Sequence, residues 1–590
     1  MIRIKRYYSV FLGMIIVLAF GQALGVFTKL NSLWRGESTK EKVLYEAIPC
    51  RIRSLDPAVS NDVYSSLQIG KIYEGLYEYH YTTSEPTLVP LLADGLPTVS
   101  KDGLTYTFKL KKGIKFQDNP CFPGGKGREI TAEDWVFSFK RFADPAVGSP
   151  WYEWVTRIVG FEAFYRVHLK AKKTDYTKNV AGLRAVDTYT FQIILAKPLP
   201  HFLSIVAMPV FGVVPKEAVE YYGKEFGNNP VGTGPFCLEG TFDPIDLKLK
   251  FKRNPTYREV YFPTNIESDF DYMRASAGKK VPFLDRIEVS ILEEESVRQL
   301  NFMRGVIDIN ENLPGEGLSK IVSSGGVLAE DLQKKGIKVY KKAGFTLTFF
   351  WFNLQHPLLQ NKLLRQAMSI GFDRARALRL VGDGYGTLAQ GIIPPGMQGA
   401  DPDYINPYGI YDVAKAKQLL AEAGYPEGKG LPEINVHTSS EDRKKVLEVF
   451  QVCMRDIGVK VKVCITPFDE LTSRVKRKGD TSIMIAAFGW GADYPDSENF
   501  LQLLYGPNKG GSNSCWFDNP VYNNLYEELL LTTDSEKKKK LYVKMNQLAG
   551  EQAPAIFLWS GVSYVLVHGK VRNYRRSEFI YSSTKYIDKD

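Results

Sequence analysis

One carboxylate follows an apolar segment in the C-terminal part of the chain. The segment SIMIAAF at residues 482–488 has the composition of a buried strand, and Asp493 follows it within FGWGADYPDSENF. An ionised carboxylate removed from water needs a cationic partner or several hydrogen-bond donors. A ligand ammonium group supplies both, so we predict that Asp493 binds an amine-bearing ligand. Trp490, with its flat face, and Tyr494 are the neighbouring candidates for contact with that ligand.

A structural role is the alternative for the same segment. Asp493 could cap the loop around Pro495 or bind a nearby amide, and Trp490 could belong to a core. Both interpretations stay open on the residues alone.

The sequence gives no sign of catalytic or metal chemistry. Its six histidines are scattered, and it contains no HExxH, GxSxG or GxxxxGK[ST] motif. The six cysteines form no CxxC pair, so we expect no metal site and no cofactor, and their disulfide pairing stays open. A pair of acids has no spacing signature, so an exported hydrolase with Asp493 and Asp496 as nominal candidates is a competing class.

The N-terminal residues have the layout of an export signal. Arg3, Lys5 and Arg6 precede an uncharged run at 7–28, and small residues follow its apolar part, with possible cleavage after Gly25. We predict that residues 1–27 are a signal peptide or an N-terminal membrane anchor, because the run approaches the roughly 20 residues that span a bilayer. The rest of the chain is then exported to the periplasm or the cell surface.

The formal net charge of +10 does not indicate nucleic-acid binding. Part of it lies in the N-terminal RIKR, and part lies on alternating segments such as DLKLKFKRN. In that segment we expect Leu247, Leu249 and Phe251 to face a core and the lysines between them to face water. The positive charge is therefore interpreted as solvated surface.

Length and patterning predict an α/β protein with more than one lobe. A chain of 590 residues with 44% hydrophobic residues exceeds what one core accommodates. Strand-like and helix-like segments alternate: TAEDWVFSFKRF begins a helix with Thr131 as its N-cap, and residues 361–382 have the spacing of one helix. Such interleaving is typical of α/β folds.

Four stretches of the chain form a recognisable series: SLDPAVSNDVYSSLQIGKIYEGLYEY at 54–79, NPVGTGPF with FKRNPTY after it, FNLQHPLLQNKLLRQAMSIGFDRARALRLVGDGYGTLAQGIIPPGM at 352–397, and WGADYPDSENFLQLLYG from 490. In this order they resemble the solute-binding proteins of peptide-type ABC transporters, which include the oligopeptide- and dipeptide-binding proteins (bacterial extracellular solute-binding family 5). The resemblance runs from about residue 43 to 567.

The resemblance implies the two-lobed periplasmic-binding-protein fold of type II, cluster C, with an extra domain inserted in the first lobe. The ranges that it implies are 43–80, 208–345 and 556–590 for lobe I, 81–207 for the inserted domain and 346–555 for lobe II. The hinge would lie near 345 and 555. The implied function is a non-catalytic, monomeric protein that captures a peptide between its lobes and delivers it to the permease of an ABC transporter.

The resemblance also implies binding residues. Asp493 matches an aspartate that pairs with the α-ammonium group of the ligand, and Trp490 matches a tryptophan that lines the cleft. Asn61 and Val63 match positions beside the bound peptide backbone, with an ordinary strand-to-helix loop as the alternative. Ala487 stands where some oligopeptide binders carry an arginine for the C-terminal carboxylate, which leaves ligand length and C-terminal recognition open. We expect NPVGTGPF to be a structural turn.

Two segments depart from the family pattern. The loop near 121 and the segment 262–280 are longer, and both are predicted to be surface loops. Relatives of this family also bind nickel complexes, sugars or haem, so a non-peptide solute is an alternative ligand. A membrane-tethered sensor with the same fold is another alternative.

Overall fold

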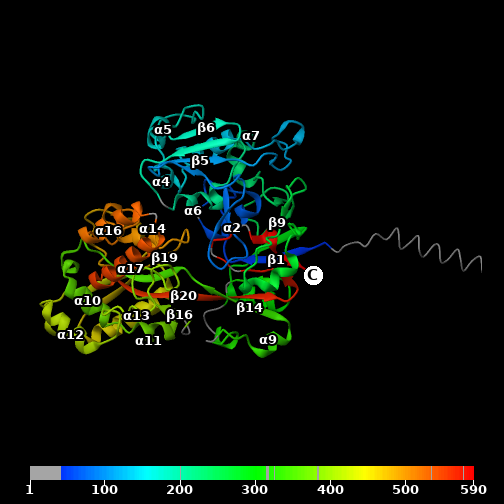
Figure 1. Cartoon of the computed structure of the whole chain (residues 1–590). Helices are drawn as coiled ribbons and strands as arrows, with labels where there is room; N and C mark the ends of the chain where they lie inside the picture. Colours follow the sequence, from blue (N-terminus) through cyan, green and yellow to red (C-terminus); the bar gives the residue numbers. More distant parts are fainter. Residues whose placement is uncertain are drawn as a thin grey trace, which may run out of the picture. The chain divides into compact units, whose positions relative to one another are not determined.

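The computed structural model describes residues 41–60, 62–199, 201–311, 313, 318–323, 326–381, 385–532, 534–575, 577, 579–581 and 583–590. The predicted signal or anchor at 1–27 and the predicted site residue Asn61 lie outside these residues. Residues Val43–Asp590 form one compact unit. Strands and helices alternate along it (Figure 1), so the α/β class predicted from the sequence is confirmed.

A four-stranded sheet joins segments that are far apart in the sequence. Its spatial order is β1 (Val43–Ile48), β12 (Arg286–Ile291), β9 (Lys248–Arg253) and β8 (Phe236–Leu238). Leu249 and Phe251 on β9 are buried and the lysines between them are exposed, as predicted. Leu247 is exposed, so its predicted place in the core is wrong, because the strand begins only at the next residue.

An eight-stranded sheet is built around one long strand, β20. The strands on its main path are β13 (Ile309–Asn310), β20 (Ala555–His568), β15 (Thr346–Phe352), β19 (Ile485–Gly491), β17 (Ile434–Thr438) and β18 (Val461–Ile465), and β14 (Ile337–Ala343) and β16 (Gly386–Leu388) also pair with β20. The N-terminal half of β20 pairs with β15 and β16, and its C-terminal half pairs with β14 and β13. β20 (red in Figure 1) thus connects two parts of the sheet.

The backbone segment that joins the two parts of this sheet, between β14 and β15, lies close to the backbone in the middle of β20. Gly344 lies between β14 and β15, and its N–H donates to the Gly561 carbonyl at 3.1 Å. Ser560 Oγ donates to the Gly344 carbonyl at 2.5 Å, and a Cβ on Gly344 would lie 2.7 Å from the Gly561 oxygen. This crossing coincides with the position near 345 at which a hinge is predicted, and the hinge itself stays a prediction.

A third, antiparallel sheet lies within the range predicted to be an inserted domain, 81–207. Its order is β4 (Thr98–Val99), β5 (Thr105–Lys109), β7 (Thr190–Ile194) and β6 (Leu183–Asp187). α3 (Ala132–Arg141) packs on this sheet. Its predicted N-cap, Thr131, is confirmed, because Thr131 and Asp134 form a capping box in which the Thr131 N–H donates to the Asp134 carboxylate at 2.8 Å.

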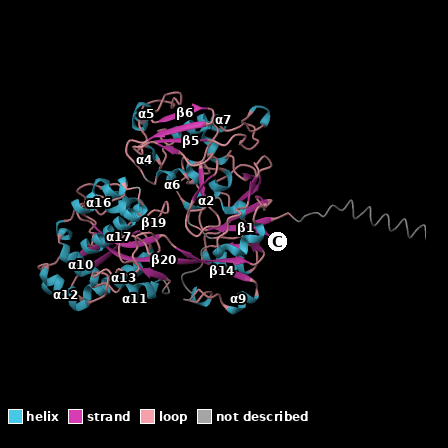
Figure 2. Cartoon of the chain, in the orientation of Figure 1, coloured by secondary structure: helices cyan, strands magenta, loops and turns pink. Residues whose placement is uncertain are grey.

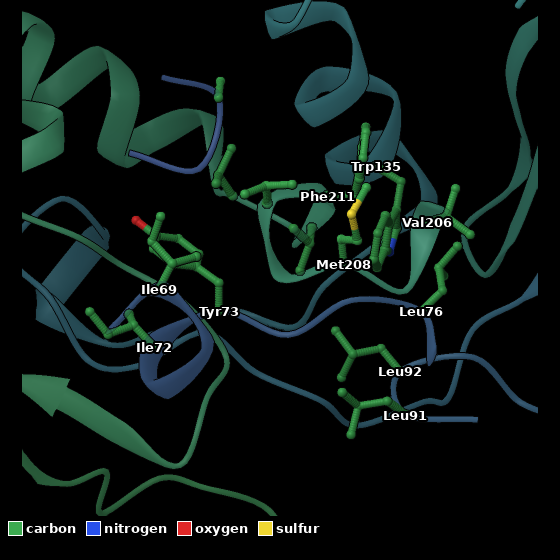
Figure 3. Close-up of a cluster of buried hydrophobic side chains, with 14 of the residues drawn as sticks. Ile69, Ile72, Tyr73, Leu76, Leu91, Leu92, Trp135, Val206, Met208 and Phe211 are labelled. Carbon is green, nitrogen blue, oxygen red and sulfur yellow. The ribbon is translucent and has the colours of Figure 1, made fainter. Parts of the chain in front are cut away.

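The NPVGTGPF turn packs against the C-terminal end of α2 (Val63–Ile72). A Cβ on Gly232 would lie 2.1 Å from the Ile72 carbonyl oxygen, and one on Gly234 would lie 2.5 Å from it. The Gly234 N–H donates to this oxygen at 2.7 Å. The turn therefore needs glycine for close backbone approach, which agrees with its predicted structural role. Figure 3 shows the apolar side chains near this helix end: Ile69, Ile72, Tyr73, Leu76, Leu91, Leu92, Trp135, Val206, Met208 and Phe211.

The structure has two helices where the sequence predicts one at 361–382. α10 (Lys362–Ile370) ends, and α11 (Arg374–Val381) begins after a short break. The Asp373 carboxylate accepts the N–H of Arg376 at 2.8 Å and so caps the second helix. The prediction was wrong because the apolar spacing continues across the break.

The segment 262–280 lies at the surface as predicted, since most of its residues are exposed, but it is anchored in a core. Phe262, Ile266 and Met273 are buried. They belong to a cluster with Tyr79, Tyr81, Val281, Phe579, Ile580 and Tyr586. The sequence-based expectation of a simple loop is therefore incomplete, because the apolar residues among the charges of the segment bury one side of it.

Further helices and two-stranded ribbons complete the description, and Figure 2 shows the helices among the strands. The helices are α4 (Tyr152–Val155), α5 (Phe161–His168), α6 (Phe202–Val206), α7 (Lys216–Tyr222), α8 (Glu295–Met303), α9 (Glu330–Lys334), α12 (Val413–Glu422), α13 (Glu441–Asp456), α14 (Phe468–Lys476), α15 (Glu498–Leu501), α16 (Pro520–Leu531) and α17 (Ser535–Gln552). The ribbons pair β2 (Tyr77–Tyr79) with β3 (Leu88–Pro90), β10 (Val260–Tyr261) with β11 (Lys280–Val281), and β21 (Val571–Arg572) with β22 (Asp588–Lys589).

Candidate ligand-binding site

Asn499 holds two of the predicted site residues beyond the end of β19. Trp490 Nε1 donates to Asn499 Oδ1 at 2.8 Å, and the Asp493 N–H donates to the same oxygen at 3.3 Å. Asn499 Nδ2 donates in turn to Asp493 Oδ2 at 3.1 Å. Asn499 is fully buried in α15, so it fixes both the indole ring and the carboxylate. Asn499 is not predicted from the sequence, because an asparagine near a helix start has no distinguishing pattern.

The carboxylate of Asp493 has no ion-pair partner among the residues that the structure describes. Burial raises its pKa above the ordinary aspartate value, and the negative charge of Glu498 adds to the rise. The hydrogen bond from Asn499 opposes this effect without cancelling it. A carboxylate in such a place is costly while it stays unpaired, and a bound cation would remove that cost.

Asp493 and Trp490 line one cavity, whose volume is about 300 Å³. This is within the range of small-molecule sites in proteins. The other lining residues are Glu153, Trp154 and Arg157 from α4 and the residues after it, and Gln502, Asn508, Gly511 and Ser512 from the segment after α15. The cavity therefore lies between the range 81–207 and the range 346–555, that is, between the predicted inserted domain and the predicted second lobe.

Tyr494, also predicted to contact the ligand, is buried and is not among the residues that line this cavity. Its ring stacks on His201 at a centroid distance of 4.6 Å, and its hydroxyl donates to Glu498 Oε2 at 2.6 Å. Tyr526 donates to the other oxygen of Glu498, and His201 Nδ1 lies 3.2 Å from Oε2. These contacts favour a structural role for Tyr494, joining the two sides beside the cavity.

Asp496 differs from Asp493 in having a cationic partner. Lys538 Nζ lies 2.6 Å from its carboxylate, and the Tyr542 hydroxyl donates to it at 2.5 Å. Burial by itself would raise the pKa of Asp496, but the charges of Lys538 and His201, together with the hydrogen bonds from Lys538 and Tyr542, outweigh burial and lower the pKa. Of these two acids in one loop, Asp493 is the one available to a ligand.

The loop that precedes α2 lies near α4, but its predicted contacts are not established. Val63 is the first residue of α2 and is 56% exposed. Trp151 Nε1 donates to the Ser60 carbonyl at 2.6 Å, which holds the loop against the residues just before α4. In the described residues no contact joins Val63 to Asp493, and Asn61 lies outside them. Ligand contacts by Asn61 and Val63 therefore stay predictions.

Ala487 is fully buried within β19, where it pairs with Phe350 of β15. It is not among the residues that line the cavity. A ligand carboxylate would thus have to be bound by a cation from elsewhere in the chain.

The described part of the chain contains no group of three or more His, Cys, Asp and Glu side chains that could hold a metal ion. All six cysteines are free thiols. The same part of the chain has no helix with the length and apolar character needed to cross a membrane.

The chain matches a known family over most of its length. The model of the family described as "Bacterial extracellular solute-binding proteins, family 5 Middle" matches residues 87–512. This range contains every residue that lines the Asp493 cavity.

Individual relatives extend this similarity. The chain is 27% identical to the glutathione-binding protein GsiB of Escherichia coli O1:K1 / APEC over 539 residues, which cover 90% of this chain and 91% of that protein. It is also 27% identical to heme-binding protein A of Haemophilus influenzae, over 522 residues that cover 87% of this chain and 86% of that protein.

Solved structures show the same fold. The periplasmic binding protein DppA of Helicobacter pylori, an ABC transporter-associated protein solved with the peptide STSA, has a TM-score of 0.70 and 25% identity, and the match covers 93% of this chain and 98% of that one. HbpA2 of Haemophilus parasuis has a TM-score of 0.72 and 24% identity, and the match covers 93% of this chain and 100% of that one. The predicted two-lobed periplasmic-binding-protein fold is confirmed.

Proposed function

We propose, since the chain belongs to family 5 of the bacterial extracellular solute-binding proteins, that it captures short peptides between two lobes and delivers them to the permease of an ABC transporter. The peptide assignment rests on one observation: the carboxylate of Asp493 lines a cavity of about 300 Å³ and has no ion-pair partner among the described residues. The named relatives are binding proteins, which supports a receptor without catalytic activity, and we propose that it acts as a monomer.

A peptide α-ammonium group matches Asp493 in charge and in hydrogen bonding. The ammonium carries three donors, and the carboxylate receives only one side-chain hydrogen bond from the described residues, from Asn499. Excluding water from the closed cavity strengthens the attraction between the two charges. Trp490 offers a flat apolar face beside the carboxylate for the adjoining part of the peptide.

Contacts across the cavity support a mechanism of capture by closure. His201 and Trp154 both contact the ring of Tyr494 from the opposite side of the predicted lobe boundary. Separating the two sides breaks these contacts and admits a ligand to Asp493, and rotation about the crossing at Gly344 restores them. The permease would then recognise the closed form.

The site of action is outside the cytoplasmic membrane in this proposal. The family is extracellular, and the sequence begins with basic residues followed by an apolar run. A cleaved signal and an uncleaved anchor at 1–27 are both consistent with this placement.

The test of the proposed function is selective loss of binding when the peptide amine is blocked. A library of di- to pentapeptides is screened by native mass spectrometry, with glutathione and haemin as comparison ligands, and the best peptide is measured by isothermal titration calorimetry. N-acetylation is expected to weaken its binding roughly 30-fold or more, because breaking a buried charge pair costs about 2–5 kcal/mol. Equal affinity of the free and acetylated peptides, or binding of haemin but of no peptide, would contradict the proposal.

Peptide affinity is also expected to fall as the pH is lowered, beginning above the pH at which an ordinary aspartate loses its charge. Burial and Glu498 raise the pKa of Asp493 in the ligand-free protein, whereas a bound ammonium favours the carboxylate. Protons therefore compete with the ligand as the pH falls through that raised pKa. Calorimetry between about pH 4 and 6.5 measures the decline, since the peptide α-amine, with an ordinary pKa of about 7.7–8.0, stays charged over this range. Constant affinity down to about pH 4 would rule out Asp493 as the anchor.

A further inference from the structure

Arg157 is a second charge without an opposite partner in the Asp493 cavity. It follows α4, and its guanidinium carbon lies 4.6 Å from the centroid of the Trp154 ring. An arginine stacked on an indole keeps the N–H groups at its edge available to an anion. The side chain is half-buried and lines the cavity, so a ligand there would meet a partly dehydrated guanidinium.

The acids of this region leave Arg157 unpaired in the described structure. Glu498 accepts hydrogen bonds from Tyr494 and Tyr526, and Asp496 pairs with Lys538. Glu153 also lines the cavity, but it is exposed and forms no ion pair with Arg157 among the described contacts. The guanidinium is thus not committed to stabilising the folded chain.

Arg157 and Asp493 are placed to act on one ligand. They line the same cavity from different parts of the chain, Arg157 after α4 and Asp493 after β19, and they form no ion pair with each other among the described contacts. The cavity therefore presents a positive group and a negative group that are not paired with each other. A short zwitterion has the complementary arrangement, with its ammonium and carboxylate at the ends of a neutral chain.

We infer that Arg157 binds a carboxylate of the same ligand whose ammonium group Asp493 binds, so that the site selects short zwitterionic peptides. This inference rests on the proposed function and adds the requirement for an anionic group. Arginine suits the task, because its planar fork binds a carboxylate through two parallel hydrogen bonds. The residue at 487 is not available for it, since Ala487 is buried away from the cavity lining.

The test is a thermodynamic cycle that combines the Arg157→Gln substitution in the protein with chemical blocking of the carboxylate in the peptide. The best-binding peptide with a free C-terminus, its C-terminal amide and its N-acetyl form are titrated into the wild-type protein and the variant. In the wild-type protein, amidation is expected to weaken binding about tenfold or more. In the variant, the free acid is expected to bind as weakly as the amide, with less than about a threefold difference between them.

A further pair of ligands identifies which carboxylate of the peptide Arg157 binds. A glutamate-containing peptide amide and its glutamine counterpart differ only in a side-chain carboxylate. If Arg157→Gln removes the preference for glutamate but C-terminal amidation has no effect, the bound group is the side-chain carboxylate, and the inference holds in that form. If neither preference depends on Arg157, the inference is overturned.

The matched control is Arg166→Gln, which makes the same change in charge on α5. Arg166 is exposed, pairs with Glu162 and does not line the cavity, so every affinity should be unchanged. The Arg157→Gln protein is expected to stay folded and to lose little thermal stability, because the described guanidinium makes no hydrogen bond and the change removes only its stacking on Trp154. Tight binding of the N-acetyl peptide to the wild-type protein would contradict the amine anchor and the proposed function. A wild-type protein that binds the N-acetyl peptide weakly but shows no preference for either carboxylate, or a preference that persists in Arg157→Gln, would contradict this inference alone.

Discussion

Replacing Asp493 with asparagine is expected to weaken peptide binding roughly 30-fold or more and, at the same time, to raise the melting temperature of the ligand-free protein at neutral pH. The loss of affinity follows from removing one partner of a buried charge pair, which costs about 2–5 kcal/mol. The asparagine side chain keeps an oxygen that can accept the hydrogen bond from Asn499, so the local structure is preserved.

The gain in stability follows from the direction of the pKa shift. Burial, then Glu498, raises the pKa of Asp493 in the folded, ligand-free protein above its unfolded value. The folded state therefore favours the protonated acid, and this contribution is lost as the pH rises through the folded pKa. At neutral pH the wild-type protein carries an unpaired, partly buried charge that the Asp493→Asn variant lacks. We expect the melting temperature to rise by about 1–3 °C, and the difference to vanish in acid.

Thermal melting between about pH 4 and 7.5, with and without peptide, measures both effects. Asp496→Asn is the matched control in the same loop, and it should lower stability at neutral pH because it removes the partner of Lys538. A lower melting temperature for ligand-free Asp493→Asn, together with unchanged peptide affinity, would mean that Asp493 is a structural residue.

Replacing Gly232 with alanine is expected to destabilise the protein by about 3 kcal/mol or more. The added Cβ would lie 2.1 Å from the Ile72 carbonyl oxygen and 3.1 Å from a ring carbon of Tyr73. The nearest atom belongs to the backbone at the end of α2, so relief requires the turn and the helix to move apart. That movement would also disturb the Gly234 N–H bond to the same oxygen, at 2.7 Å.

Urea unfolding followed by circular dichroism measures this loss. Gly491→Ala is the control, because its Cβ would come no closer than 3.8 Å to Thr346 Cγ2 and its φ is not in the left-handed region. A Gly232→Ala protein as stable as the Gly491→Ala protein would show that the turn and the end of α2 can move apart without lowering the free energy of unfolding. A role of the NPVGTGPF turn as a rigid support for the end of α2 would then be excluded.

Structural features that depend only on residues close together in the sequence could be predicted. The capping box at Thr131 and the buried positions Leu249 and Phe251 follow from local patterns, and the structure has them. The exposure of Leu247 and the helix break at Gly371 were not predicted, because the periodic spacing of apolar residues says little about where a strand or helix begins or ends.

The candidate site could be predicted only in part, because its other members are joined to it by tertiary contacts. Asp493 and Trp490 lie close together in the sequence and line the same cavity. Asn499 holds them by hydrogen bonds that no spacing rule indicates, and Arg157 reaches the cavity from a distant part of the chain. No local sequence pattern indicates the stacking of Tyr494 on His201 either, because the two residues are far apart in the sequence.

The pairing of β20 has a consequence for the order of assembly. All of its strand partners, β13, β14, β15 and β16, precede it in the sequence, and it lies between them in the eight-stranded sheet. During synthesis, the earlier strands must wait for residues 555–568 before the sheet can close, because no other segment occupies that position. A nascent chain therefore cannot complete this sheet until residues 555–568 have been synthesised.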